Sequence, residues 1–157
     1  MTQLVPAGFA PKVPPGADRI RRILCDEGFR AVFVGGCVRD TLLGLSAADW
    51  DIGTSARPED CMRIFLHHGI EVIPTGLRHG TVTVLWDGAG YEVTTFREDA
   101  GYSDGRRPDA VMFTDSLEQD LARRDFTINA IAWDPETGLI DPFDGQADLK
   151  AGRIRTV

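Results

Sequence analysis

The sequence predicts an α+β fold. Segments with the i, i+3, i+4 spacing of apolar residues that is typical of helices alternate with short apolar, β-branched segments that are typical of strands. The chain has 157 residues, 43% of them hydrophobic, which is enough for one globular core and favours a single domain. No apolar stretch approaches the roughly eighteen residues of a membrane span, so we expect a soluble protein with no membrane partner.

The first 15 residues differ from the rest of the chain. They are rich in proline and show no helical or strand periodicity, which is typical of a flexible arm. We therefore divide the chain into a flexible N-terminal arm, residues 1–15, and one domain, residues 16–157.

A helix, a strand and a second helix open this domain. Residues 17–27 carry apolar side chains at helical spacing from Ile20 onward, and a glycine follows them. Residues 29–36, FRAVFVGG, are apolar and β-branched and end in two glycines. Residues 37–44, CVRDTLLG, resume the helical spacing, so the two glycines are expected at a strand-to-helix turn.

A helix and a hairpin are predicted in the middle of the chain. Ser55 is expected to cap a helix that has Pro58 in its first turn. The buried side of this helix is expected to consist of Met62, Ile64, Phe65 and Leu66. Residues 81–97 alternate about Asp87 and Gly88, which predicts a β-hairpin.

The last third of the chain is more varied. Residues 98–110 are polar and rich in glycine, which favours a mobile surface loop. Residues 116–126 predict a helix that Ser116 caps. Residues 133–157 are rich in turns, with short strand-like pieces.

Charge and cysteine content limit the possible functions. A formal net charge of -7 argues against a chain whose whole surface binds nucleic acid, because neutralising phosphates requires clustered Lys and Arg. Any RNA affinity must therefore be local or supplied by a partner. Cys25, Cys37 and Cys61 lack metal-ligand spacing, and we interpret them as reduced, buried thiols of a cytoplasmic protein.

Two carboxylates stand on either side of a tryptophan in DWDIGTSA, residues 49–56. In a strand, Asp49 and Asp51 project to one face, and Trp50 and Ile52 project to the other. Adjacent carboxylates repel each other, and Mg²⁺, which binds oxygen ligands together with substrate phosphates, would offset that repulsion. The alternative is an ordinary solvated strand face or turn.

Other residues could complete such a site. The turn at Gly35 and Gly36 lets backbone N–H groups approach an anion, and Arg39 lies one helical turn further on with a side chain suited to phosphate. Glu92, in the second strand of the predicted hairpin, could add a third carboxylate. Alone, the glycines are compatible with a simple turn and Glu92 with an exposed strand position.

The order of these features suggests nucleotidyl transfer assisted by two metal ions, in which no protein nucleophile is needed. His67, His68 and His79 show neither zinc-type spacing nor a Ser or Cys partner, so they offer no competing chemistry.

These residues belong to blocks that resemble the catalytic head domain of class II tRNA nucleotidyltransferases and bacterial poly(A) polymerases. The resemblance extends from about residue 17 to the last residue. The blocks are VGGCVRDTLLG, DWDIGTSARPED, EVTTFR, YSDGRRPDAV, SLEQDLARRDFTINAIAWDP and LIDPFDGQADLKAGRIRTV. Residues 73–97 are more similar to the CCA-adding members than to the poly(A) polymerases.

The resemblance implies a fold and roles for individual residues. The fold is a mixed β-sheet of the polymerase-beta-like nucleotidyltransferase type, with helices packed on one face. Asp49, Asp51 and Glu92 correspond to catalytic, metal-binding carboxylates for two Mg²⁺ ions. The residues that correspond to the nucleotide-binding positions are Gly35, Gly36, Arg39, Arg123, Arg124, Asp125 and Asn129.

The implied activity is transfer of CMP or AMP from CTP or ATP to the 3′ end of tRNA, with release of pyrophosphate. Family members continue into neck, body and tail domains, which read the base and hold the tRNA. We therefore expect either a truncated chain, a fragment, or half of a split enzyme whose partner chain supplies those domains, and low activity of the chain alone. The alternatives are a poly(A) polymerase head, a non-catalytic nucleotide- or partner-binding module, and a minimal transferase that modifies a protein or small molecule.

Overall fold

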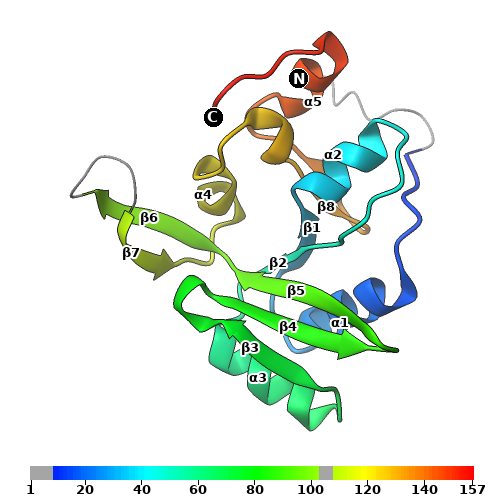
Figure 1. The fold of residues 1–157 in the computed structure, drawn as a ribbon, viewed down its shortest axis with the longest axis vertical. Helices are drawn as coiled ribbons and strands as arrows, with labels where there is room; N and C mark the ends of the chain where they lie inside the picture. The colour runs from blue at the N-terminus through cyan, green and yellow to red at the C-terminus, as the bar shows by residue number, and fades with distance from the viewer. Residues whose placement is uncertain (1–8, 103–107) are drawn as a thin grey trace.

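The computed structural model describes residues 9–102 and 108–157 (Figure 1). Within these residues, seven strands form one sheet in the order β3-β4-β5-β2-β1-β8-β9. Neighbouring strands run antiparallel except β2 and β5, which are parallel, so the predicted mixed sheet of an α+β domain is confirmed. The strands are β1 (Ala31–Val34), β2 (Ile52–Thr54), β3 (Val72–Gly76), β4 (Thr81–Trp86), β5 (Ala89–Thr95), β8 (Ala132–Asp134) and β9 (Gly138–Ile140).

Helices contact both faces of the sheet. Side chains alternate along β1, so Phe33 joins the larger hydrophobic cluster and Val32 joins a smaller one on the opposite face. Helices α1 and α3 pack on the first face, whereas α4 adds its apolar side to the second cluster. The expectation that the helices pack on one face is therefore wrong for α4, whose Leu117 and Leu121 cover the opposite side of β1. The helices are α1 (Pro15–Asp26), α2 (Gly36–Leu42), α3 (Pro58–His67), α4 (Leu117–Ala122) and α5 (Gly145–Ala151), with short 3₁₀ turns η1 (Leu77–His79) and η2 (Thr127–Asn129).

Several local predictions are confirmed. The first helix spans Pro15–Asp26, and the glycine turn lies between β1 and α2. The hairpin of β4 and β5 turns at Asp87 and Gly88, which both have positive φ. The Oγ of Ser116 accepts a hydrogen bond from the backbone N–H of Gln119, 3.2 Å away, and so caps α4.

The predicted loop over residues 98–110 is wrong for its described part. Strands β6 (Arg97–Tyr102) and β7 (Pro108–Phe113) pair antiparallel as a second, two-stranded sheet, and residues 103–107 lie outside the described residues. This hairpin projects from the main sheet (Figure 1). The sequence favoured a loop because this segment is polar and rich in glycine.

Helix α5 was also missed in the tail, where β8 and β9 are the expected short strands. The carboxylate of Asp141 accepts hydrogen bonds from the backbone N–H groups of Gly145, at 2.7 Å, and Gln146, at 2.8 Å. These bonds satisfy donors at the start of α5 from a residue that precedes the helix by four positions. The glycines and prolines around it favoured turns instead.

Two details of α3 differ from the prediction. Pro58 does begin the helix, but the Oγ of Ser55 accepts a hydrogen bond from the backbone N–H of Arg30 at 2.9 Å and makes no cap. Leu66 is 61% exposed, whereas Ile64 and Phe65 are buried. Cys61, Ile64 and Phe65 lie at i, i+3 and i+4, so the buried stripe is narrower than predicted.

A row of aromatic rings connects the core to the segment before β2. The ring of Phe33 contacts Trp50 edge-on, with centroids 5.2 Å apart, and stacks on Trp133 at 5.7 Å. Phe9 meets Trp133 edge-on at 5.8 Å. Residues 1–8 lie outside the described residues, so the flexible arm and the domain boundary at residue 16 stay predictions.

Two further observations bear on the sequence predictions. Cys25, Cys37 and Cys61 form no disulfide, and burial raises the pKa of the Cys37 thiol to about 11 and that of Cys61 to about 12. In the part of the chain that the structure describes, no helix has the length and apolar character needed to cross a membrane.

The orientation of α3 can be tested with adjacent residues. We expect Phe65→Ala to lower the free energy of unfolding by about 3–5 kcal/mol, because it leaves a cavity in the core. Leu66→Ala should change it by less than about 0.5 kcal/mol, because the side chain is exposed. Urea unfolding followed by circular dichroism measures both, and similar losses in the two variants would contradict this orientation.

Candidate active site

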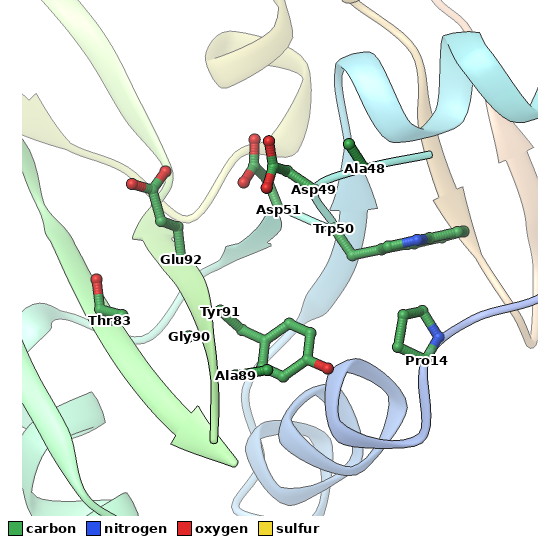
Figure 2. Close-up of a pocket in the computed structure, with 10 residues that line it drawn as sticks. All are labelled: Pro14, Ala48, Asp49, Trp50, Asp51, Thr83, Ala89, Gly90, Tyr91 and Glu92. Atoms are coloured by element: carbon green, nitrogen blue, oxygen red, sulfur yellow. The ribbon is translucent and has the colours of Figure 1, made fainter. Parts of the chain in front are cut away.

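Pairing between β2 and β5 brings the predicted carboxylates together. Ile52 pairs with Val93 in this parallel pair, so Asp51 and Glu92 occupy equivalent positions one residue before each. Figure 2 shows the carboxylates of Asp49 and Asp51 side by side and that of Glu92 on the same side of the sheet. The ring of Trp50 points away from them and is buried, as the sequence predicts.

The surroundings of Asp51 oppose its ionisation. Burial raises the pKa of this carboxyl above its ordinary value, and the negative charges of Glu92 and Asp49 raise it further. The positive charge of Arg124 acts in the opposite direction but is the smallest of these influences. The carboxylates therefore form a locally negative site whose repulsion a cation would relieve.

The three carboxylates line a pocket of about 580 Å³ (Figure 2). Its lining also includes Thr83, which pairs with Glu92 across β4 and β5, and the aromatic residues Trp50 and Tyr91. Among the described residues, no Lys, Arg or His lines this pocket.

The glycine turn adjoins the acidic residues from the other side. The backbone N–H of Val34 donates to the carbonyl oxygen of Asp51 at 3.1 Å, which fixes the end of β1 against this residue. Gly35 has φ +78°, and a Cβ placed on it would lie 3.0 Å from Nη1 of Arg124. Glycine is therefore required both for the backbone conformation and for the approach of the guanidinium.

Arg39 and Asn129 connect the glycine turn to the second cluster of predicted residues. Nη1 of Arg39 donates to Oδ1 of Asn129 at 2.6 Å, and its Nε and Nη2 each lie 2.9 Å from Oδ1 of Asp40. Nδ2 of Asn129 in turn donates to Oδ1 of Asp125 at 3.2 Å. Residues that lie 90 positions apart in the sequence thus form one network.

Sequence reasoning missed Asp120, which orients both arginines of the RRD segment. Its buried carboxylate lies 3.5 Å from Nε of Arg123 and 3.4 Å from Nη2 of Arg124. It also accepts a hydrogen bond from the backbone N–H of Arg97 at 3.1 Å. The i, i+3 and i, i+4 spacing from Asp120 was the available signal.

A second missed carboxylate, Asp148, supports the segment that follows these arginines. Its Oδ2 accepts hydrogen bonds from the hydroxyl of Thr127 at 2.6 Å and from Nε of Arg155 at 2.9 Å. Thr127 also donates its backbone N–H to the carbonyl oxygen of Arg155 at 3.0 Å. Because these partners are far apart in the sequence, no local pattern indicated them.

The residues present fit Mg²⁺ by their chemistry. Asp49, Asp51 and Glu92 offer only oxygen atoms, and the raised pKa of Asp51 reflects a charge that a cation would compensate. Among residues 9–102 and 108–157, no three His, Cys, Asp or Glu side chains stand as a preformed metal site. Mg²⁺ commonly uses one or two carboxylates together with substrate phosphates, so binding by these three residues stays a prediction.

The structure thus places the ten predicted site residues around one region. The carboxylates line the pocket, and the glycine turn adjoins Arg124. Hydrogen bonds connect Arg39, Asn129 and Asp125, and Arg123 shares the carboxylate of Asp120 with Arg124. A mixed sheet that carries acidic residues at matching positions of two adjacent parallel strands, next to oriented arginines, is typical of the nucleotidyltransferase class of α+β domain.

Comparison with known proteins identifies the family. Residues 31–155 match the poly A polymerase head domain family, and the chain belongs to that family. The sequence is 53% identical over 149 residues to the CCA-adding enzyme of Latilactobacillus sakei subsp. sakei (strain 23K), covering 95% of this chain and 36% of that enzyme. The resemblance to this family in the sequence is thereby confirmed.

Solved structures agree with this assignment. A crystal structure of the Bacillus stearothermophilus CCA-adding enzyme in complex with CTP matches with a TM-score of 0.78 and 46% identity, over 92% of this chain and 34% of that chain. A tRNA nucleotidyltransferase complexed with a primer tRNA and an incoming ATP analogue matches with a TM-score of 0.65 and 34% identity, over 87% and 38%. This chain therefore spans about a third of the length of these relatives.

The raised pKa of Asp51 predicts that ionisation of this residue destabilises the fold. The folded protein prefers protonated Asp51, so stability present at low pH is lost as the pH rises through the raised pKa. Asp51→Asn stays neutral, and we expect it to melt at a higher temperature than the wild type at pH 7 in EDTA. The difference should vanish as the pH falls below about 3.8, the ordinary value.

Thermal unfolding followed by circular dichroism measures this effect. Glu136→Gln, which removes an exposed charge elsewhere, controls for the general effect of a less negative protein and should leave the melting temperature nearly unchanged. An Asp51→Asn protein that melts at or below the wild-type temperature at pH 7 would contradict the electrostatic description.

Ionisation of Asp148 should stabilise the folded protein, in contrast to ionisation of Asp51. The hydroxyl of Thr127 and the guanidinium of Arg155 hold the pKa of Asp148 below its ordinary value of 3.8, so its contribution is present at neutral pH and is lost as the pH falls through the lowered pKa. We expect Asp148→Asn to lower the urea midpoint at pH 7, with a difference that shrinks below about pH 3.8. Equal midpoints at pH 7 would refute this role.

Proposed function

We propose that this domain transfers CMP and AMP from CTP and ATP to the 3′-hydroxyl of tRNA and releases pyrophosphate. The observation that carries this proposal is the position of Asp51, which lies beside Glu92 on the parallel strand and against the cationic glycine turn on its other side. The relatives support tRNA as the acceptor, since they are CCA-adding enzymes and a tRNA nucleotidyltransferase.

The cationic side of the site is suited to the nucleotide. Arg124 is held by Asp120 and faces the glycine turn, and its buried Nε has no hydrogen-bond partner. We propose that Arg124, Arg39 and the backbone of Gly36 bind the triphosphate, because guanidinium groups pair well with phosphate oxygens. Asp125, Asn129 and Arg123 would contact the ribose and the remaining phosphate oxygens.

The reaction needs no covalent intermediate on the protein. The acceptor 3′-oxygen forms a bond to the α-phosphorus, the bond from that phosphorus to the oxygen bridging to the β-phosphate breaks, pyrophosphate leaves, and the hydroxyl proton passes to solvent. When bound by Asp49, Asp51 and Glu92, two Mg²⁺ ions would lower the pKa of the attacking hydroxyl and stabilise the leaving pyrophosphate. In this proposal, the acceptor sugar and the triphosphate approach Asp51 from different sides.

Two tasks are assigned to other regions. The relatives are about three times as long as this chain. We propose that regions equivalent to the rest of these relatives select the base and bind most of the tRNA, either in the same polypeptide or in a separate one. The net charge of -7 supports this division, because a domain of this charge attracts an RNA backbone only locally. Cytoplasmic location stays a prediction.

The proposal predicts that Asp51→Asn loses catalysis while it keeps the fold. The assay uses labelled CTP and ATP, Mg²⁺ and a tRNA transcript that lacks its terminal CCA. It is run with the protein and with a hybrid in which residues 9–157 replace the matching head of the Bacillus stearothermophilus CCA-adding enzyme. Loss of an outer-shell partner commonly costs a factor of 10–100, so loss of a direct metal ligand should lower incorporation by more than about 100-fold.

The same assay separates the alternatives. Incorporation near the wild-type level in Asp51→Asn would refute the assignment, and Glu136→Gln serves as the charge-matched control with unchanged activity. Long tails from ATP alone would favour a poly(A) polymerase head. Labelling of a protein or small molecule without RNA would favour a different transferase, and nucleotide binding that ignores both Mg²⁺ and Asp49 would favour a non-catalytic module.

A further inference from the structure

The two flanks of Asp51 differ sharply in charge. Arg124 lies at Gly35, and Arg39, in the helix after the glycine turn, bonds to Asn129. Arg123 shares the carboxylate of Asp120 with Arg124. The pocket of about 580 Å³ on the other flank carries three carboxylates, and no cationic side chain among the described residues lines it. This pocket therefore offers no cationic side chain to a triphosphate, whereas its carboxylates and one hydroxyl can accept hydrogen bonds from the hydroxyl groups of a sugar.

The size and lining of the pocket also suit a nucleoside. Its volume lies within the range of about 300–1,000 Å³ that is typical of sites for small ligands. It combines the carboxylates with apolar surface from Trp50 and Tyr91 and with one hydroxyl, that of Thr83. If the triphosphate occupies the arginine flank, this pocket is where the attacking sugar must approach the same carboxylates.

Thr83 occupies a defined position in this pocket. It pairs with Glu92 across β4 and β5, and cross-strand partners have Cβ atoms about 4.5–5.5 Å apart. Figure 2 shows the hydroxyl of Thr83 on the same side of the sheet as the carboxylates of Glu92 and Asp51. Its Oγ1 lies 2.9 Å from Oγ1 of Thr75, which orients it, and a hydroxyl can donate one hydrogen bond and accept two.

We propose that this pocket binds the terminal ribose of the acceptor RNA and that Thr83 contacts its 2′-hydroxyl, so that Thr83 makes the enzyme prefer an RNA end over a DNA end. The proposal rests on the proposed function, because it places the 3′-hydroxyl at Asp51 and Glu92. The 2′-hydroxyl is on the carbon next to the one that carries the 3′-hydroxyl. Thr83 is the cross-strand neighbour of Glu92, so a sugar whose 3′-hydroxyl lies at Glu92 can present its 2′-hydroxyl to Thr83. The 2′-hydroxyl is the group by which proteins distinguish RNA from DNA.

The test compares two acceptors that differ in one atom. The tRNA transcript of the previous assay is prepared with a ribose or a 2′-deoxyribose at its 3′ end. For both acceptors, kcat/KM for CMP addition is measured with the hybrid enzyme, in which the head is either wild type or a variant. We expect the wild type to prefer the ribose end, and Thr83→Val to lower that preference by about threefold to tenfold, the loss of one neutral hydrogen bond. Thr83→Ser, which keeps the hydroxyl, should keep the preference.

Thr81→Val is the matched control. Thr81 lies two residues earlier on the same face of β4, and its Oγ1 likewise lies 3.0 Å from another threonine, Thr94, but it does not line the pocket. This variant should retain the wild-type preference, and circular dichroism verifies the fold of all three proteins.

The outcomes separate the two proposals. A wild type that adds no nucleotide to either acceptor refutes the proposed function and, with it, this inference. A wild type that adds CMP equally well to both ends overturns the inference alone. So does a Thr83→Val protein whose preference stays within about twofold of the wild type, or a Thr81→Val protein that loses the preference to the same extent.

Discussion

Repulsion between acidic side chains that the pairing of β2 with β5 brings together is the constraint on which the site depends. Asp51 and Glu92 occupy matching positions on the two strands, and Asp49 joins them from the segment before β2. Among the described residues, the positive charge of Arg124 opposes this repulsion only weakly, because it is the smallest influence on the pKa of Asp51. Their arrangement is held by apolar packing instead, because Trp50, which lies between the two aspartates in sequence, is buried against Phe33.

Asp148 and Asp51, two buried or partly buried aspartates, have opposite effects on the stability of the fold. Asp148 is surrounded by donors from Thr127 and Arg155, and it stabilises the segment that carries Asn129. Asp51 has like charges as neighbours, and its ionised form works against the folded state. The surroundings of Asp148 stabilise the fold. Those of Asp51 lower the stability of the folded protein, which is typical of functional sites, and a bound cation would compensate its negative charge.

The sequence predicted those parts of the molecule in which local pattern and tertiary environment agree. Trp50 and Asp51 alternate as a half-buried strand should, and the glycines between β1 and α2 could be recognised from the change of periodicity. The sequence did not predict the edge strand β3, because Pro74 interrupts its pattern. Proline within a sheet is found mainly on edge strands. Strands β6 and β7 were missed because residues 98–110 are polar and rich in glycine, a composition that is typical of loops.

The missed site residues share one property, which is that their partners lie far away in the sequence or across the sheet. Asp148 bonds to Thr127, and Thr83 acquires its place beside Glu92 only when β4 and β5 pair. The family resemblance supplied the roles of Arg124 and Asp125, but it does not show which side chains hold them. Asp120, which orients Arg124, became visible only in the structure.

The parallel pairing of β2 with β5 determines when the acidic residues come together during folding. Parallel strands cannot be joined by a tight turn, and here α3, β3 and β4 intervene between the two. The acidic residues therefore meet only after the whole crossover has formed, and a shift of β5 by one residue would bring Tyr91 to the place of Glu92. Half-folded chains consequently lack the cluster of carboxylates on which the proposed metal site depends.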